Sequence, residues 1–143
     1  MSPAPQTLLG FDYGSKRIGV AVGQEQTRTA TPLATVTVTR DQPDWDAITQ
    51  LVANWKPDTL IVGLPLNEDG SEHAITVAAR RFSRQLFGRY HLPVHTVDER
   101  LSSYAAQHMP RPQGAVPKRN QTVDKVAAQV ILQAWLDRGP HEG

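Results

Sequence analysis

The sequence has no cysteine, few aromatic residues and no long hydrophobic run. Of its 143 residues, 6% are aromatic. The lack of cysteine excludes disulfides and thiol catalysis, and it fits a reducing compartment. A run of about eighteen apolar residues, as a membrane helix requires, is absent, and no basic and hydrophobic leader is recognisable. We therefore expect neither membrane insertion nor secretion.

An excess of charge of either sign is also lacking. Fifteen Lys and Arg residues stand against 14 Asp and Glu, which gives a net charge of +1. Any contact with nucleic acid must therefore come from a local basic patch. The candidates are Lys16, Arg17, Arg100, Arg111, Lys118 and Arg119. A second group of cations on a predicted helix favours a solvated face instead; it comprises Arg80, Arg81, Arg84 and Arg89.

The length predicts one domain over residues 1–143, with frayed ends at 1–6 and 139–143. Strands are expected near 8–13, 18–22, 31–39, 59–64 and 94–97. Helices are expected over 45–55 after an Asp44 N-cap, from Ser71 to Gly88, over 102–108 and over 123–136. The order β-β-β-α-β-α-β-α-α predicts an α/β fold, a mixed five-stranded sheet with helices on both faces.

The segment from Asp12 to Ile18 places a carboxylate at the end of an apolar strand and follows it with glycine and two cations. The pattern predicts a strand, a tight turn and a second strand. A buried and unpaired carboxylate costs free energy, so Asp12 should be solvated, paired with a cation or bound to a metal. An isolated Asp-x-Gly more often forms only a polar hairpin.

A second acidic strand end occurs at Asp98-Glu99. Neighbouring residues of a strand point to opposite faces, so only one of these two acids can share a site with Asp12. The longer side chain favours Glu99, and Asp98 stays the alternative. Asp98 could then orient Arg100 or cap the following turn.

A third acid, Asp124, opens the apolar stripe of the last predicted helix. An acid in a first turn often only complements the helix dipole. Because Thr122 can serve as the N-cap, Asp124 is free to face the sheet. Three carboxylates from separate elements are what two-metal phosphodiester cleavage requires, with two Mg²⁺ or Mn²⁺ ions roughly 3.5–4 Å apart.

Other residues that could carry chemistry have simpler explanations. We expect the tryptophans to be core anchors, because each falls on an apolar helical stripe; these are Trp45, Trp55 and Trp135. No metal-ligand spacing links the histidines, which are expected on helix faces, turns and strands; these are His73, His91, His95 and His108. Tyr13 and Tyr104 could stack on a base or sugar.

Four motifs, read in order, resemble those of the YqgF family of Holliday junction resolvases, also described as pre-16S rRNA nucleases. They are DYGSKRIGVAVG, IVGLPLNEDGSE, VDERLSSYAA and VDKVAAQVILQAWL. The resemblance implies an RNase H-like fold and a cytoplasmic bacterial nuclease with two-metal catalysis. It matches Asp12, Glu99 and Asp124 to the family's acids, and Lys16, Arg17 and Arg100 to the basic positions beside them.

The sequence leaves the substrate open. The resemblance favours processing of the 5′ end of pre-16S rRNA, a structured RNA, and a four-way DNA junction is the alternative. A nucleotide-binding, ATPase-like module and a catalytically idle RNA-binding regulator are further alternatives. The loop from Met109 to Gln121 has three cations and several prolines, whereas the family pattern is richer in lysine. Lys118 and Arg119 of this loop are expected to contact the substrate. The protein could be a monomer or a homodimer.

Overall fold

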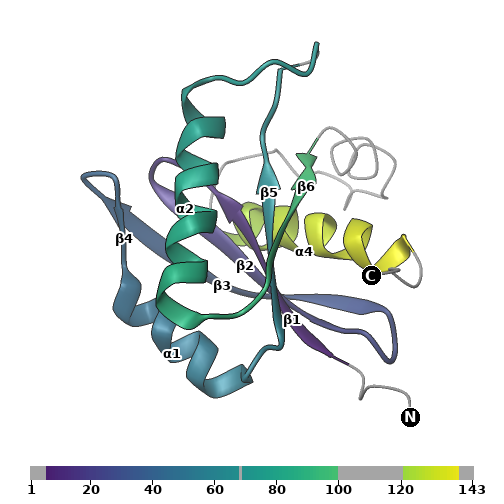
Figure 1. Cartoon of the computed structure of the whole chain (residues 1–143). Helices are drawn as coiled ribbons and strands as arrows, with labels where there is room; N and C mark the ends of the chain where they lie inside the picture. The colour runs from purple at the N-terminus through teal and green to yellow at the C-terminus, as the bar shows by residue number, and fades with distance from the viewer. Residues whose placement is uncertain (1–5, 68, 100–120, 139–143) are drawn as a thin grey trace.

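The first strands of the chain form an antiparallel meander, which the later strands extend in parallel. The computed structural model describes residues 6–67, 69–99 and 121–138. Its strands are β1 (Thr7–Tyr13), β2 (Arg17–Gln24), β3 (Thr29–Thr39), β4 (Gln42–Pro43), β5 (Thr59–Leu64) and β6 (Val94–Asp98). They form one sheet in the order β4-β3-β2-β1-β5-β6 (Figure 1). The central strand β1 is therefore antiparallel to β2 and parallel to β5.

Within the described residues the sheet has six strands rather than the predicted five, because a short hairpin adds β4. Thr39 pairs with Gln42, and the two residues between them, Arg40 and Asp41, have φ angles of 52° and 61°. Two successive left-handed residues define the tight hairpin turn that matches the twist of paired strands. Asparagine and glycine usually signal this turn, and neither occurs here, so the sequence pattern did not reveal it.

Three helices are described: α1 (Trp45–Trp55), α2 (Ala74–Tyr90) and α4 (Gln121–Asp137). Asp44 caps α1 as predicted, since its carboxylate accepts a hydrogen bond from the amide of Ala47 at 3.2 Å. The predicted limits of α2 were wrong: its N-cap is His73, and the helix continues past Gly88 to end at the left-handed His91. None of the described helices is long and apolar enough to cross a membrane.

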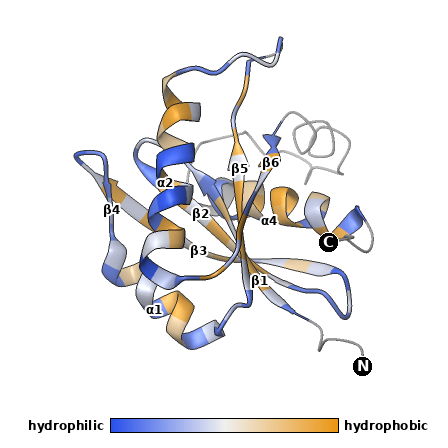
Figure 2. Ribbon diagram, in the orientation of Figure 1, coloured by the Kyte–Doolittle hydropathy of each residue, from blue (hydrophilic) through white to orange (hydrophobic). Residues whose placement is uncertain are grey.

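Two hydrophobic cores lie on opposite faces of the sheet, as the predicted two-sided arrangement requires. One contains α1 and α2 and is rich in aromatic rings, with Phe82 packed against Phe11 and Trp45. The other lies under α4 and consists of aliphatic and small side chains. All six residues of β5 are buried between the two, which confirms the predicted strand over residues 59–64. Apolar residues accordingly concentrate along the central strands (Figure 2).

Of the three predicted tryptophan anchors, Trp55 is the exception. Trp45 packs in the α1–α2 core and Trp135 against the α4 core. Trp55 is 40% exposed. Burial along α1 falls from fully buried Ile48 to partly buried Val52, and Trp55 is the last residue of the helix.

Candidate active site

Asp12 lies on the central strand between two glycines. It pairs with Gly19 of β2 on one side and with Gly63 of β5 on the other. Directly paired residues share a face of the sheet. Alternation along β1 puts Leu8 and Gly10 on this face too, and both contact or pack with α4 residues. The row centred on Asp12 therefore faces α4.

The two glycines allow other acidic residues to approach Asp12. A methyl group at Gly19 would lie 1.8 Å from the carbonyl oxygen of Asp124, and one at Gly63 would lie 2.8 Å from Oε1 of Glu99. Any larger residue at Gly19 would thus push away the start of α4, and one at Gly63 would collide with the Glu99 carboxyl group. Because neither glycine has a side chain, there is room next to Asp12 for Asp124 on one side and Glu99 on the other.

The face alternation of β6 distinguishes Glu99 from Asp98. Val97 belongs to the α4 core, so the strand directs residue 97 toward the face that carries Asp12. Residue 98 then points to the other face, and residue 99 returns to the first. Glu99 follows the last strand residue and lines the same cavity as Asp12. This placement supports the preference for Glu99, whose catalytic role stays a prediction.

An ion pair joins the second strand to the last helix. Nε of Arg17 donates a hydrogen bond to Oδ2 of Asp124 at 2.7 Å, and the two side chains are 36% and 13% exposed. A charge-assisted bond of this kind is stronger than a neutral one. It fixes the head of α4 over the β1–β2 turn and neutralises part of the acidic charge. The helix α4 begins at Gln121, two residues before the predicted start at Val123.

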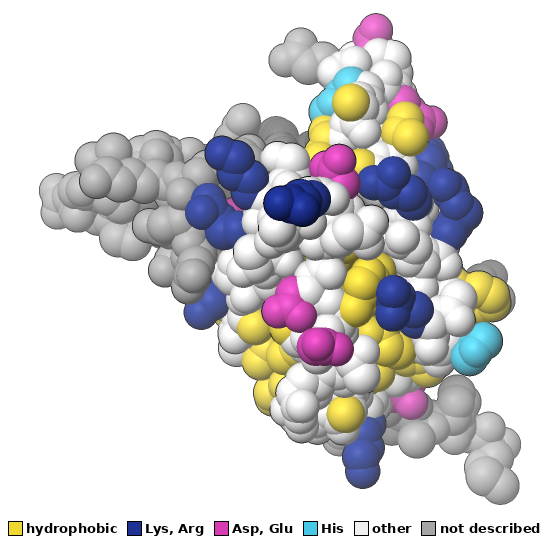
Figure 3. Space-filling view, turned by 90° about the vertical axis from the view of Figure 1, so that its left-hand side faces the viewer, with side chains coloured by type: hydrophobic (Ala, Val, Ile, Leu, Met, Phe, Trp, Pro, Cys, Tyr) yellow, Lys and Arg dark blue, Asp and Glu magenta, His cyan; other side chains and the backbone are white. Residues whose placement is uncertain are grey.

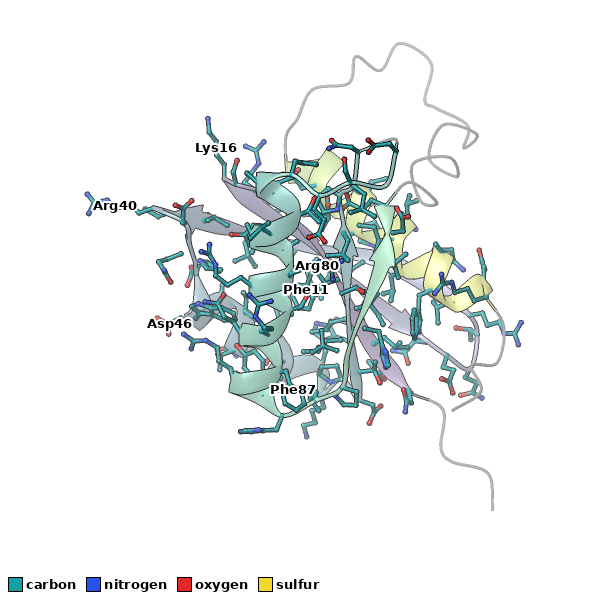
Figure 4. The ribbon with its side chains drawn as sticks, turned by 45° about the horizontal axis from the view of Figure 1, so that its top comes forward. Phe11, Lys16, Arg40, Asp46, Arg80 and Phe87 are labelled. Carbon is teal, nitrogen blue, oxygen red and sulfur yellow. The ribbon has the colours of Figure 1, made fainter. Side chains whose placement is uncertain are left out.

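A cavity of about 730 Å³ opens above these residues. It lies between the β1–β2 turn, the start of α2, the end of β6 and the start of α4. Its lining includes Asp12, Glu99, Asp124, Lys16, Arg17, Pro65, His73, Ala74 and Ala78. Lys16 is exposed and projects from the tip of the β1–β2 turn (Figure 4). The three predicted acids and two of the predicted cations therefore surround one space.

The donors in this cavity suit a hard divalent cation, since carboxylate oxygens are the ligands that Mg²⁺ and Mn²⁺ prefer. Within the described part of the chain, however, no three acidic or histidine side chains lie close enough together to hold one ion. The carboxylate of Asp124 is engaged by Arg17. The chemistry of the site fits a metal, and an ion at Asp124 would compete with Arg17 for the negative charge of this carboxylate.

Tyr13 also lines the cavity, but it is only 6% exposed and its ring packs on Phe82 at a centroid distance of 5.2 Å, so the core holds the ring. Other predicted residues lie away from the cavity. His95 of β6 stacks on Trp135 at 4.8 Å. Six predicted contact or helix residues fall outside the described part of the chain: Arg100, Tyr104, His108, Arg111, Lys118 and Arg119. The predicted 102–108 helix and the Met109–Asn120 segment also fall outside it.

Sequence reasoning did not identify Gly19 and Gly63 as part of the site. A glycine inside a strand pattern often marks a close approach of another backbone, and both residues carried that signal. The proximity of His73 and Ala74 had no comparable signal, because it follows from how α2 sits beside the sheet.

A mixed sheet with an acid on its central strand and a final helix across one face is the architecture of the RNase H-like fold. Two solved structures share it. The chain is similar to "T. thermophilus RuvC in complex with Holliday junction substrate" with a TM-score of 0.59, 13% identity and coverage of 93% and 94% of the two chains. It is similar to "Thermus thermophilus RuvC structure" with a TM-score of 0.54, 15% identity and coverage of 92% and 95%.

Sequence comparison gives the family. The family model "RuvX: Holliday junction resolvase" matches residues 6–138, and the chain belongs to this family. Relatives described as "Putative pre-16S rRNA nuclease" include a Nitrosococcus oceani protein, 53% identical over 92% of this chain and 87% of its own length. A Pseudomonas putida protein is 48% identical over 91% and 94% of the two chains. The resemblance found in the four motifs is thereby confirmed.

Proposed function

We propose that this chain is a divalent-metal-dependent endonuclease that cuts structured RNA and processes the 5′ end of the 16S rRNA precursor. The observation that carries the proposal is the enclosure of Asp12, Glu99 and Asp124 around one cavity, with glycines on both sides of Asp12. The descriptions of the curated relatives support the choice of RNA. We further propose that the protein acts in the cytoplasm as a single domain.

Each acid has a role in this proposal. Asp12, Glu99 and Asp124 would hold two Mg²⁺ or Mn²⁺ ions, which would supply an activated water and Lewis-acid stabilisation of the leaving oxygen. Asp12 comes from the rigid central strand and sets the position of the other ligands. Arg17 holds Asp124 in place and keeps acidic charge compensated before metal arrives.

The cations of the cavity bind substrate. Lys16 stands exposed on the rim, where its ammonium group can meet a phosphate. Among the described residues it forms no ion pair. Arg100, Lys118 and Arg119 are proposed to extend this contact, and they lie outside the described residues. Binding through such contacts weakens steeply with salt, because phosphates release condensed counterions when lysine and arginine replace them.

A four-way DNA junction is the second candidate substrate. The family description and the fold shared with the RuvC structures favour it. The same acids serve either substrate, so the site does not choose between them. A junction would call for two copies of the chain that present two sites to opposite arms.

The experiment that tests the function compares the wild-type protein with Asp12→Asn on labelled precursor RNA and on a labelled four-way DNA junction. Each is incubated with Mg²⁺, with Mn²⁺ or with chelator. We expect metal-dependent cleavage of the RNA, and a loss of about a thousandfold or more in Asp12→Asn, equivalent to about 4 kcal/mol of barrier. The matched control is Asp46→Asn, which neutralises an exposed acid in the first turn of α1, on the other face of the sheet.

Cleavage of the junction alone would assign the protein to DNA. Equal cleavage by wild type and Asp12→Asn would remove Asp12 from the site. Binding of RNA with no cleavage under any metal condition would favour the regulator and refute the nuclease.

A further inference from the structure

The helix α2 carries a concentration of charge that the proposed active site does not use. Between Ala74 and Tyr90 it contains four arginines and no acid. The whole chain has a net charge of +1, so the remaining residues together carry −3. Positive side chains gather along this side of the molecule in the space-filling view (Figure 3). This asymmetry is large for a chain whose overall charge is near zero.

Two of the four arginines are already engaged within the fold. Nε of Arg80 lies 2.9 Å from a carboxylate oxygen of Glu72, and Arg89 lies 4.1 Å above the ring of Trp45. Arg81 and Arg84 are exposed, and within the described residues neither forms an ion pair. Two fixed cations without a compensating acid are suited to an anionic partner.

The position of α2 connects these two arginines with the active site. Ala74 and Ala78, in the first turns of the helix, line the cavity that holds the three acids. Residues at i, i+4 and i+7 share one side of a helix, so Arg81 continues the stripe formed by Ala74 and Ala78. Arg84 lies one turn further along. The charged surface therefore begins where the cavity ends.

The distance of Arg81 and Arg84 from the cavity, measured along α2, determines which part of a bound substrate they can contact. A rise of about 1.5 Å per residue places Arg81 and Arg84 about 12 and 16 Å beyond His73 at the cavity. A B-form DNA duplex advances about 3.4 Å per base pair and an A-form RNA duplex somewhat less, so the two distances correspond to about four and about five base pairs.

We propose that Arg81 and Arg84 bind the phosphate backbone of a duplex arm of the substrate, about four to five base pairs from the cleavage site. This inference rests on the proposed function, since it assigns the substrate a duplex segment beside the cut. Charge complementarity selects nucleic acid as the occupant. A second copy of this chain would bring two groups of four arginines together, although the exposed ring of Phe87 on the same helix could otherwise serve such a contact.

The test measures binding of two hairpin RNAs that share the same single-stranded precursor end. One has a stem of about 14 base pairs and the other a stem of about 3, which ends before the distance that Arg81 and Arg84 reach. The parent is Asp12→Asn, which prevents turnover, and fluorescence anisotropy is recorded across a salt series. Arg81→Gln/Arg84→Gln is compared with Arg28→Gln/Arg138→Gln, which removes two exposed charges from the β2–β3 turn and the end of α4.

For the long stem we expect Arg81→Gln/Arg84→Gln to lower the slope of log affinity against log salt by about 1.8, because two phosphate contacts are lost. The factor by which affinity falls between 50 and 200 mM salt should be about ten times smaller in this variant than in the parent. The short stem and the control variant should keep the parent slope. Arg81→Lys/Arg84→Lys, which retains both charges, should bind the long stem with a slope close to that of the parent.

An unchanged slope on the long stem, with binding otherwise intact, would overturn this inference and leave the nuclease standing. An equal change on both stems would also overturn it, since the contact would not depend on the distant part of the arm. If the parent protein bound neither RNA, the proposed function would be wrong as well. An unchanged slope together with dimers that Phe87→Ala abolishes would assign the surface to a second copy.

Discussion

The two faces of the sheet are built from different residues. Beneath α1 and α2, rings from β1, α1 and α2 fill the space, with Phe82 in contact with Phe11, Tyr13 and Trp45. Beneath α4, glycines and alanines let the helix approach the strands. On the α1–α2 face, large aromatic side chains bury apolar surface. On the α4 face, glycine and alanine leave room for close contacts between the helix and the strands. Stability and chemistry are thereby assigned to opposite faces of one sheet.

The largest expected effect concerns the aromatic face. Replacing fully buried Phe82 with alanine removes three ring contacts and leaves a cavity, so the free energy of unfolding should fall by about 3–5 kcal/mol. The matched control is Phe87→Ala, an exposed phenylalanine on the same helix, with a change within about 0.5 kcal/mol. Denaturant titration measures both. A similar loss in the two variants would mean that α2 packs differently.

The next effect concerns the glycine face. A methyl group at Gly19 would meet the backbone of Asp124 at 1.8 Å, so Gly19→Ala must displace α4. We expect a loss of about 2–3 kcal/mol in stability and a loss of about a hundredfold in cleavage rate, because ligands move out of position. In contrast, a methyl group at Gly88 meets nothing within 4 Å.

Gly88→Ala is therefore the control, and it should stabilise the protein by up to about 1 kcal/mol through helix propensity. Thermal melting and single-turnover cleavage distinguish the two variants. Full activity in Gly19→Ala would show that the position of α4 does not matter for the chemistry.

The smallest expected effect concerns the ion pair between Arg17 of β2 and Asp124 of α4. Arg17→Gln leaves Asp124 without its cation, which should cost no more than about 1 kcal/mol in chelator, since Arg17 is partly exposed. Mn²⁺ should raise the melting temperature of this variant more than that of wild type, because the metal no longer competes with the guanidinium. Lys16→Gln, at the neighbouring exposed position, is the control. A smaller Mn²⁺ response in Arg17→Gln than in wild type would contradict the competition.

Most strands could be predicted because their apolar patterns are local. The continuous apolar run from Thr59 to Leu64 predicted β5 with the bounds that the structure has, and the capping side chain of Asp44 predicted the start of α1. The β4 hairpin and the end of α2 were missed, since Arg40, Asp41 and His91 adopt left-handed angles usually left to glycine or asparagine. Those conformations are imposed by the surrounding strands and helices.

The site was predictable in part for a similar reason. The three acids stood out because each ends or begins an apolar element. The pair formed by Arg17 and Asp124 spans 107 positions in the sequence, and only the packing of α4 brings the two together. The spacing of Gly19 and Gly63 around Asp12 depends on strand register, which no single motif contains.

The dependence of the site on α4 also sets when the protein can become active. The meander of β1 to β3 needs only neighbouring sequence, whereas Asp124 joins Arg17 after more than a hundred further residues have been made. Local contacts form early and distant ones late, and chains begin to fold from their N-terminal side during synthesis. A nascent chain would therefore hold an ordered sheet with Asp12 in place and still lack its third acid, so catalytic competence would come only with the last helix.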